Sequence, residues 1–312
     1  MSSNEKAGEP MEEASARPRR TRRRKRRLLP LLILLAALAV AVPVVLSLLP
    51  RHPRVQEETD PHAGQIYVND GANMVWLTPH SGLPLNPFTA EDFARGEDGS
   101  LRYTGMEGTV RLGVDVSDYQ TNVDWQRLAA QGVDFAILRV GYTGYTKGTH
   151  RADSAFARHL KNARAAGLDV GVYYFSQALT VQEAAAEAAH VLTLLQGVSL
   201  ELPVYFDWEP VSADDSRTAS YGYTHLTESA AAFCRVIESG GYAAGVYLNR
   251  QQGYYHYDLS RLADYALWVA DYNDYPDFYY AFDMWQYTDS AALDGMPTQA
   301  DLNLLFVPSP RA

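Results

Sequence analysis

The residues best suited to chemistry are two carboxylates in the segment Tyr205-Phe206-Asp207-Trp208-Glu209. Asp207 and Glu209 are two positions apart, so on an extended strand both side chains point to the same face. Two like charges that lie close together in a partly dry cleft do not both ionise easily, so the pKa of one carboxyl rises. The pair then consists of a proton donor and a carboxylate, which are the groups that cleave a glycosidic bond.

Other acidic residues lie at the ends of short apolar runs. Asp115 ends the run 112–116, Asp271 follows 266–270, and Asp301 precedes 302–306. A single acid at such a position is more often a solvated strand end. The chain also has 21 Tyr and 5 Trp, many of them near these acids. Because aromatic faces stack on the C–H faces of sugars, the combination indicates an acidic cleft for a polysaccharide.

Alternating strands and helices must position these side chains. Eight apolar runs predict strands, at residues 112–116, 135–141, 170–175, 202–207, 244–248, 266–270, 282–287 and 302–306. Helices are predicted between the first five of them, at residues 123–131, 153–166, 180–195 and 224–239. This alternation indicates a parallel sheet covered by helices. Eight strands fit a closed barrel of five strand–helix units and three further strands, with catalytic groups at the C-terminal strand ends. An open doubly wound sheet is the alternative.

Several other chemistries have no support in the sequence. It has no glycine-rich nucleotide-binding motif, no G-x-S-x-G element and no H-E-x-x-H element. Its one cysteine, Cys234, excludes an intramolecular disulfide and any multi-cysteine metal site. Glycosidic cleavage by two carboxyls requires neither a metal nor a cofactor. The net charge of −10 arises although residues 1–27 are strongly basic, so the rest of the chain should repel nucleic acid.

The N-terminal residues are predicted to anchor the protein in a membrane. Residues 28–49 form a run of 22 residues without a charge, which as a helix reaches about 33 Å. Residues 1–27 hold ten basic and four acidic residues, and positive charge stays in the cytoplasm. We therefore expect a single-pass protein that contacts the bilayer through residues 28–49, with a cytoplasmic N-terminus and an extracellular catalytic domain. A cleaved signal peptide is the alternative.

Between this run and the barrel, the chain is predicted to form a linker and a small β-rich segment. Residues 50–64 are polar, and the segment spans 65–110, before a barrel over 111–312. The runs 65–68 and 74–77 flank Asn69-Asp70-Gly71, a turn signal, and predict a hairpin. The segment is too short for a large core of its own. We expect it to pack against the barrel or to help bind glycan, with Trp76 in the core.

The ordered motifs resemble glycoside hydrolase family 25, the lysozymes of the Chalaropsis type. The resemblance begins at 113–117, with Gln120 and 123–125, and is sharpest at the D-x-E strand 205–209. In the same order it includes residues 135–141, 171–175, 245–247, 267–272, 284–287 and Asp301. It covers about residues 111–307 and says nothing of 1–108. The bulky Trp208, the following Pro210 and the polar loop 211–223 depart from a minimal family member.

The resemblance implies a TIM-like (β/α)5(β)3 barrel that hydrolyses the β-1,4 bond between N-acetylmuramic acid and N-acetylglucosamine in peptidoglycan. Glu209 is then the general acid and Asp207 the second carboxylate. Asp207 acts either as a nucleophile or by orienting the substrate's own acetamido group, and we favour the second role. The residues expected to shape the cleft or contact the substrate are Asp115, Asp301, Tyr173, Tyr247, Trp268, Asp271 and Gln286.

The sequence leaves two alternative functions open. One is a non-catalytic peptidoglycan-binding module on the same barrel, against which the presence of both Asp207 and Glu209 argues. The other is a chitinase-like hexosaminidase, because D-x-E strands occur in such enzymes too.

Overall fold

The computed structural model of the 312-residue chain describes residues 28–48, 60–96, 101–105 and 108–311. The chain divides into two compact units, Met1–Asp60 and Pro61–Ala312. In the first unit, helix α1 (Leu28–Leu48) occupies the predicted apolar run.

Within the described part of the chain, no helix meets the combination of length and hydropathy that crossing a bilayer requires. The transmembrane anchor predicted over residues 28–49 is not confirmed. The predicted basic tail 1–27 and linker residues 50–59 lie outside the described residues.

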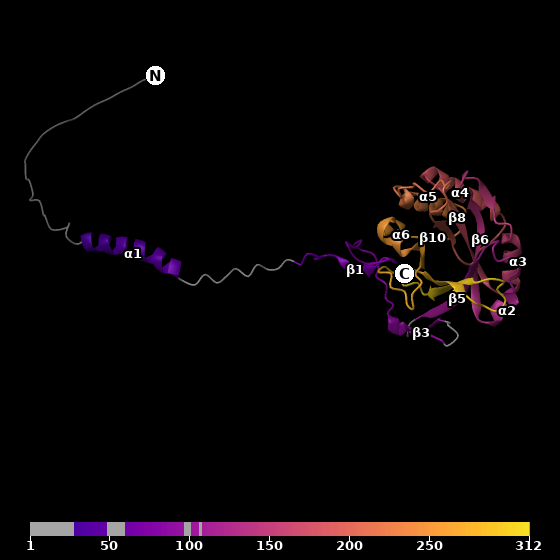
Figure 1. The fold of residues 1–312 in the computed structure, drawn as a ribbon, viewed down its shortest axis with the longest axis horizontal. Helices are drawn as coiled ribbons and strands as arrows, with labels where there is room; N and C mark the ends of the chain where they lie inside the picture. Colours follow the sequence, from indigo (N-terminus) through magenta and orange to yellow (C-terminus); the bar gives the residue numbers. More distant parts are fainter. Residues whose placement is uncertain (1–27, 49–59, 97–100, 106–107, 312) are drawn as a thin grey trace, which may run out of the picture. The chain divides into compact units, whose positions relative to one another are not determined.

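The second unit is built on a closed barrel of eight strands (Figure 1). The sheet closes because β5 pairs with β13 on one side and with β6 on the other. This closure confirms the predicted barrel and rules out the open sheet. In order around the barrel, the strands are β5 (Thr109–Val116), β6 (Val133–Thr143), β8 (Asp169–Ser176), β9 (Val204–Trp208), β10 (Ala244–Asn249), β11 (Ala266–Ala270), β12 (Met284–Ala291) and β13 (Ala300–Val307). A short strand, β7 (His150–Ala152), pairs with β6 outside the ring.

The last strand runs opposite to the others. β13 is antiparallel to both β12 and β5, so the parallel sheet expected from the sequence does not include it. No helix lies between β12 and β13, and a chain that turns back without a crossover must reverse its direction. The reversal brings the N-terminal end of β13 to the C-terminal ends of the other strands, where Asp301 lies opposite Asp115.

Helices cover the outer face of the barrel from β5 to β10, and Figure 1 shows α2 to α5 outside the ring of strands. Asp124 and Thr180 cap two of these helices by accepting a backbone N–H with their side chains. The helix that follows the fifth barrel strand, which the sequence analysis did not locate, is α6, with Asn249 as its cap. The helices are α2 (Trp125–Ala130), α3 (Phe156–Ala165), α4 (Val181–Leu194), α5 (Leu226–Ser239) and α6 (Arg250–Tyr255), with a 3-10 turn, η2 (Leu259–Leu262).

Large side chains fill the barrel interior because glycines face them. A Cβ atom at Gly113 would lie 2.2 Å from the ring of Phe135, and one at Gly245 would lie 2.5 Å from the ring of Tyr205. Both rings belong to a buried interior cluster that also includes Trp268. The interior is therefore a packed core, as in other barrels of this kind. It supports the polar end of the barrel from below.

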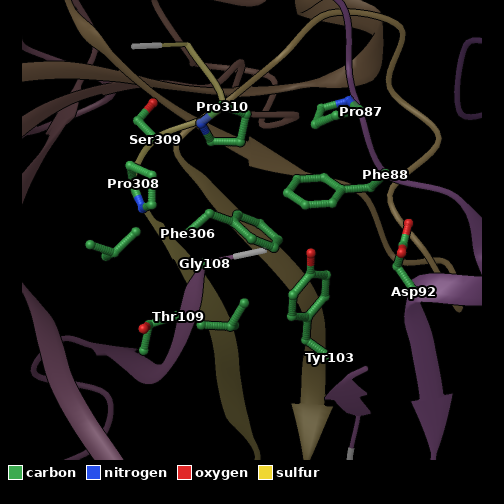
Figure 2. A pocket seen from close by; sticks show the side chains of 12 residues that line it. Pro87, Phe88, Asp92, Tyr103, Gly108, Thr109, Phe306, Pro308, Ser309 and Pro310 are labelled. Carbon is green, nitrogen blue, oxygen red and sulfur yellow. The ribbon is translucent and has the colours of Figure 1, made fainter. Parts of the chain in front are cut away.

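The N-terminal segment of the second unit covers the strands that have no helices. Phe88 packs on Phe306 of β13 with ring centroids 4.1 Å apart, and Phe93 packs edge-on against Trp285 of β12 at 5.3 Å. Figure 2 shows Phe88 and Tyr103 directed toward Phe306 in a pocket of about 400 Å³. The segment thus replaces the missing helices. Its elements are β1 (Ile66–Asn69), β2 (Met74–Leu77), the 3-10 turn η1 (Ala90–Asp92), β3 (Phe93–Arg95) and β4 (Leu101–Tyr103).

The predicted hairpin is present, with β1 antiparallel to β2 and Tyr67 opposite Trp76. The expectation that Trp76 lies in the core is wrong, because its side chain is 44% exposed. The indole instead stacks on His62, with ring centroids 4.1 Å apart. A two-stranded sheet has no further layer to cover both of its faces, which explains the exposure.

Candidate active site

Four acidic side chains from three strands meet at one end of the barrel, in a cleft of about 290 Å³. Asp115 comes from β5, Asp207 and Glu209 come from the end of β9, and Asp301 comes from the start of β13. Each occupies an inward-facing position of its strand, because side chains alternate between the two faces of a sheet. The cleft therefore lies at the end of the barrel where catalytic groups are found in barrel enzymes.

The alternation along β9 fixes the direction of the D-x-E pair. Trp208, between the two acids, is fully buried on the helix side, and its Nε1 donates a hydrogen bond of 2.9 Å to the carbonyl oxygen of Ala178. Gln177 holds the backbone at the next position. Its Nε2 donates to the carbonyl oxygens of Ser176 at 2.8 Å and of Glu209 at 2.7 Å. These hydrogen bonds therefore hold the backbone around Asp207 and Glu209 from the helix side of the strand.

The two carboxyls differ in exposure. Asp207 is 4% exposed, whereas Glu209 is partly exposed. Burial raises the pKa of Asp207, and the neighbouring charge of Glu209 raises it further. Burial also raises the pKa of Glu209, helped by the charge of Asp115. Because two such carboxyls cannot both be charged at low cost, the pair favours a state in which the two groups share one proton.

Asp115 is held by a network of amides. Nε2 of Gln286 and Nδ2 of Asn303 each donate a hydrogen bond of 2.8 Å to Oδ2 of Asp115. The hydroxyls of Tyr247 and Tyr272 each donate to Oε1 of Gln286 at 2.9 Å. Because the amide oxygen is occupied in this way, the NH2 group of Gln286 must point at Asp115. The network stabilises a carboxylate at this position.

Asp301 is the partner of Asp115 across the β13–β5 pairing. Burial, reinforced by the charge of Asp115, raises the pKa of Asp301 to about 9. Burial also raises the pKa of Asp115, but the amides of Asn303 and Gln286 oppose that rise. At neutral pH, Asp301 is therefore protonated. Although the cleft holds four acids, no group of three or more His, Cys, Asp or Glu within the described ranges is placed to hold a metal ion.

One cation that the sequence analysis did not select, Arg139, also lines the cleft. Its Nε donates to Oδ2 of Asp153 at 2.8 Å, and its Nη2 bonds to Asp118. Its positive charge opposes the rise in the pKa of Asp207. The signal was present in the sequence, because Arg139 follows the inward-facing Ile137 by two positions and so shares its face of an otherwise apolar strand.

Tyr173, Tyr247 and Trp268 all line the cleft, as does Gln286. Trp268 is only 2% exposed, and its ring packs edge-on against Tyr247 with centroids 4.7 Å apart. Its Nε1 donates a hydrogen bond of 2.8 Å to Oδ1 of Asn303. Trp268 therefore orients the amide network and offers no open face to a sugar.

Exposed aromatic rings lie at the mouth of the cleft instead. The side chain of Tyr119 is 78% exposed and that of Tyr272 is 51% exposed. Both line the cleft. They are the rings on which a sugar could stack without any rearrangement of the barrel.

Asp271 does not join the cleft. It lies one position beyond the inward-facing Ala270, so its side chain points to the other face of the strand. There it is buried, with Oδ1 3.3 Å from Nη1 of Arg250, and Oδ2 accepts the N–H of Asp277 at 2.9 Å. The structure thus separates Asp271 from the other predicted substrate contacts and places it in the wall of a neighbouring hollow.

Residues 114–296 match the sequence model of "Glycosyl hydrolases family 25". The chain is 28% identical over 198 residues to YegX of Escherichia coli K12, covering 62% of this chain and 68% of YegX. It is 26% identical over 193 residues to the autolytic lysozyme of Clostridium acetobutylicum, covering 61% of this chain and 54% of that protein.

A solved structure shares the fold. The autolysin LytC of Streptococcus pneumoniae, solved in complex with a synthetic peptidoglycan ligand, superposes with a TM-score of 0.57 at 21% identity. The superposition covers 68% of this chain and 51% of LytC. The chain therefore spans about half the length of LytC and of the clostridial lysozyme.

Proposed function

Since more than half of its residues match the family's sequence model, the chain belongs to glycosyl hydrolase family 25, and we propose that it is a muramidase. The bond cleaved is the β-1,4 linkage between N-acetylmuramic acid and N-acetylglucosamine in peptidoglycan. The observation that carries this proposal is the pair Asp207 and Glu209, which faces one cleft with raised pKa values.

Glu209 is the general acid. It is the more exposed carboxyl of the pair, so it can reach the oxygen of a bound glycosidic bond. Burial and the charge of Asp115 raise its pKa, which favours the protonated form that a general acid requires. The proton passes to the leaving oxygen as the bond to the anomeric carbon breaks.

Asp207 assists the reaction by orienting the acetamido group of the sugar. The acetamido oxygen attacks the anomeric carbon, while the carboxylate accepts the amide N–H. The support for this role is that Oδ1 of Asp207 is buried and has no hydrogen-bond partner among the described residues, so a substrate donor would satisfy it. Water then adds to the anomeric carbon and gives a proton to Glu209, while the bond from the acetamido oxygen to that carbon breaks, which restores the acetamido group and the starting state of the two carboxyls. Direct attack by Asp207 is the alternative.

The remaining cleft residues set the charge around the reacting sugar. Asp115, fixed by two amide donors, presents a negative charge toward the positive charge that develops at the anomeric carbon. Protonated Asp301 lies opposite Asp115 and limits the repulsion within the acidic cluster. Arg139, which also lines the cleft, offsets that repulsion with its positive charge.

Turnover of purified peptidoglycan tests the proposal. The full-length chain should release new reducing ends, and Glu209→Gln should abolish release while binding to peptidoglycan persists. Asp214→Asn, at an exposed acid in the loop after the D-x-E pair, is the matched control. Binding without release by the unmodified chain would instead indicate a binding module, and a preference for chitin would indicate a hexosaminidase.

We also propose that the protein is attached to the cell membrane with its barrel outside the cell. The support comes from the sequence, in which an uncharged run at 28–49 follows a strongly basic segment. Fractionation of cells that produce the full chain tests this location. Recovery of the intact chain in the membrane fraction after a high-pH wash is expected, and its recovery in the wash would contradict the proposal.

A further inference from the structure

A second hollow, of about 580 Å³, opens beside the acidic cleft. Glu209, Tyr247 and Tyr272 line both spaces, so the two are continuous. The other walls of the hollow come from the start of α6, from the segment after β11, and from Asp70 and Gly71 in the hairpin turn. The N-terminal segment, which lies outside residues 114–296 of the family match, therefore contributes directly to the space next to the general acid.

The hairpin turn is fixed in this position. Oδ1 of Asp70 accepts the N–H groups of Ala72 and Asn73 at 2.8 Å, which closes the turn. Its Oδ2 accepts the hydroxyl of Tyr255 in α6, also at 2.8 Å. Nδ2 of Asn69 donates to the side chain of Asp277 at 3.3 Å. The turn is therefore tied to the barrel from both sides and forms a preorganised wall.

A buried cation joins the parts of this wall. Arg250 is 9% exposed, and its Nη1 lies 3.3 Å from Oδ1 of Asp271 and bonds to Asp277. Gly71 of the turn lies against the same side chain, since a Cβ built there would be 3.6 Å from Nε of Arg250. Asp271, predicted to contact the substrate, thus acts here by holding Arg250 rather than by facing the cleft.

The position of the hollow indicates what it binds. Asp207 and Asp115 line the cleft but not the hollow, whereas Glu209 lines both. A general acid stands at the bond that breaks, between the sugar that reacts and the sugar that leaves. We infer that the hairpin turn and the start of α6 form a binding site for the leaving side of the glycan chain. This inference rests on the proposed function.

The lining suits a sugar of the N-acetylhexosamine class. Asn249, Gln251 and Asn273 supply amide groups that can pair with hydroxyl and acetamido groups. The half-exposed ring of Tyr272 offers an apolar face. The volume falls in the range of about 300–1,000 Å³ that small-molecule sites occupy. The hollow is thus large enough for glycan beyond the scissile bond.

Binding of peptide-free glycan fragments to the full-length Glu209→Gln chain tests the site, measured by calorimetry with a disaccharide and a tetrasaccharide from peptidoglycan. A tetrasaccharide that spans Glu209 reaches the hollow and should bind at least about tenfold more tightly than the disaccharide. Gln251→Trp, which places an indole in the hollow, should remove that gain. Gln196→Trp is the matched control, because Gln196 is an exposed glutamine in the loop before β9, at the opposite end of the barrel.

A second pair of variants tests the hairpin itself. Tyr255→Phe removes the hydrogen bond to Asp70 and should weaken tetrasaccharide binding about threefold, whereas Tyr275→Phe, outside the lining of the hollow, should not. If Gln251→Trp melts at a lower temperature than its parent, Gln251→Ala, which only removes the amide, decides in its place. Equal tetrasaccharide affinity in the Gln251 and Gln196 variants overturns the inference.

These experiments distinguish a failure of the hydrolase assignment from a failure of the proposed glycan site. If the unmodified chain does not cleave peptidoglycan but the tetrasaccharide gain depends on Gln251, the hydrolase assignment fails and the glycan site stands. If cleavage occurs and the gain does not depend on Gln251, the hydrolase stands and the site fails.

Discussion

Replacement of Asp301 by Asn should stabilise the protein increasingly as the pH rises. In the folded chain, burial and the charge of Asp115 raise the pKa of Asp301 from its ordinary value of 3.8 to about 9. The unfolded chain loses this proton above about pH 4. Between these values the folded state binds one more proton than the unfolded state, so the free energy of unfolding falls as the pH rises. Asn has the same shape, does not titrate, and can still donate a hydrogen bond to Asp115.

The magnitude of the stability change follows from the shift in the pKa of Asp301. One pH unit within the window corresponds to about 1.4 kcal/mol, so the interval from pH 5 to pH 8 corresponds to at most about 4 kcal/mol. Asp301 is partly exposed at the cleft, and solvent screening reduces this value. We expect the stability difference between Asp301→Asn and the unmodified chain to grow by about 2 kcal/mol from pH 5 to pH 8.

Urea unfolding of both proteins at several pH values measures this difference. Buried carboxyls that do not interact with Asp301 contribute equally to both proteins and cancel in the subtraction. Asp115 interacts with Asp301, so the difference reports the two residues together. Asp214→Asn, at an exposed position, controls for the loss of one surface charge. A difference that stays constant within about 0.5 kcal/mol from pH 5 to pH 8 would refute the claim that Asp301 is protonated in the folded cleft.

Two further predictions concern residues around the cleft and its support. Gln177→Ala removes the amide that donates to the carbonyl oxygen of Glu209. The kcat on peptidoglycan should fall at least about tenfold, because small displacements of a catalytic group are costly. An unchanged kcat would contradict this prediction. Phe88→Ala should lower the free energy of unfolding by about 2 kcal/mol, less than the cost for a fully buried Phe, because Phe88 is only partly buried against the barrel. Tyr67→Ala, at an exposed ring of the same segment, should cost much less in the same urea experiment.

The face on which a side chain lies explains most of what the sequence could predict about the site. Asp207 and Glu209 share a face because strands repeat every two residues. The same rule, applied to β11, places Asp271 opposite to the inward-facing Ala270 and could have excluded it from the cleft. Applied to β6, the same rule places Arg139 on the inward face with Ile137 and could have predicted it as a cleft residue. Residue type and nearness to a strand end group Asp271 with the cleft acids and overlook Arg139, whereas the alternation along each strand places Arg139 in the cleft and Asp271 in the wall of the neighbouring hollow.

Other features depend on contacts between distant segments and had no local signal. The reversal of β13 follows from a connection without a helix, and it decides that Asp301 faces Asp115. The hairpin turn was predictable from Asn69-Asp70-Gly71, but its place beside Glu209 depends on Tyr255 and Asp277. Periodicity along one segment cannot identify such partners, since they are about 200 positions away in the sequence.

The helix-free side of the barrel connects the N-terminal segment to the chemistry. The family match spans residues 114–296, so neither the covering segment nor β13 belongs to it. Yet β12 and β13 carry Gln286 and Asn303, whose amides hold Asp115 at 2.8 Å. The outer faces of the same strands pack on Phe88 and Phe93. Because a small shift of β13 would break a hydrogen bond to Asp115, loss of this cover should lower kcat under conditions in which the barrel is still folded.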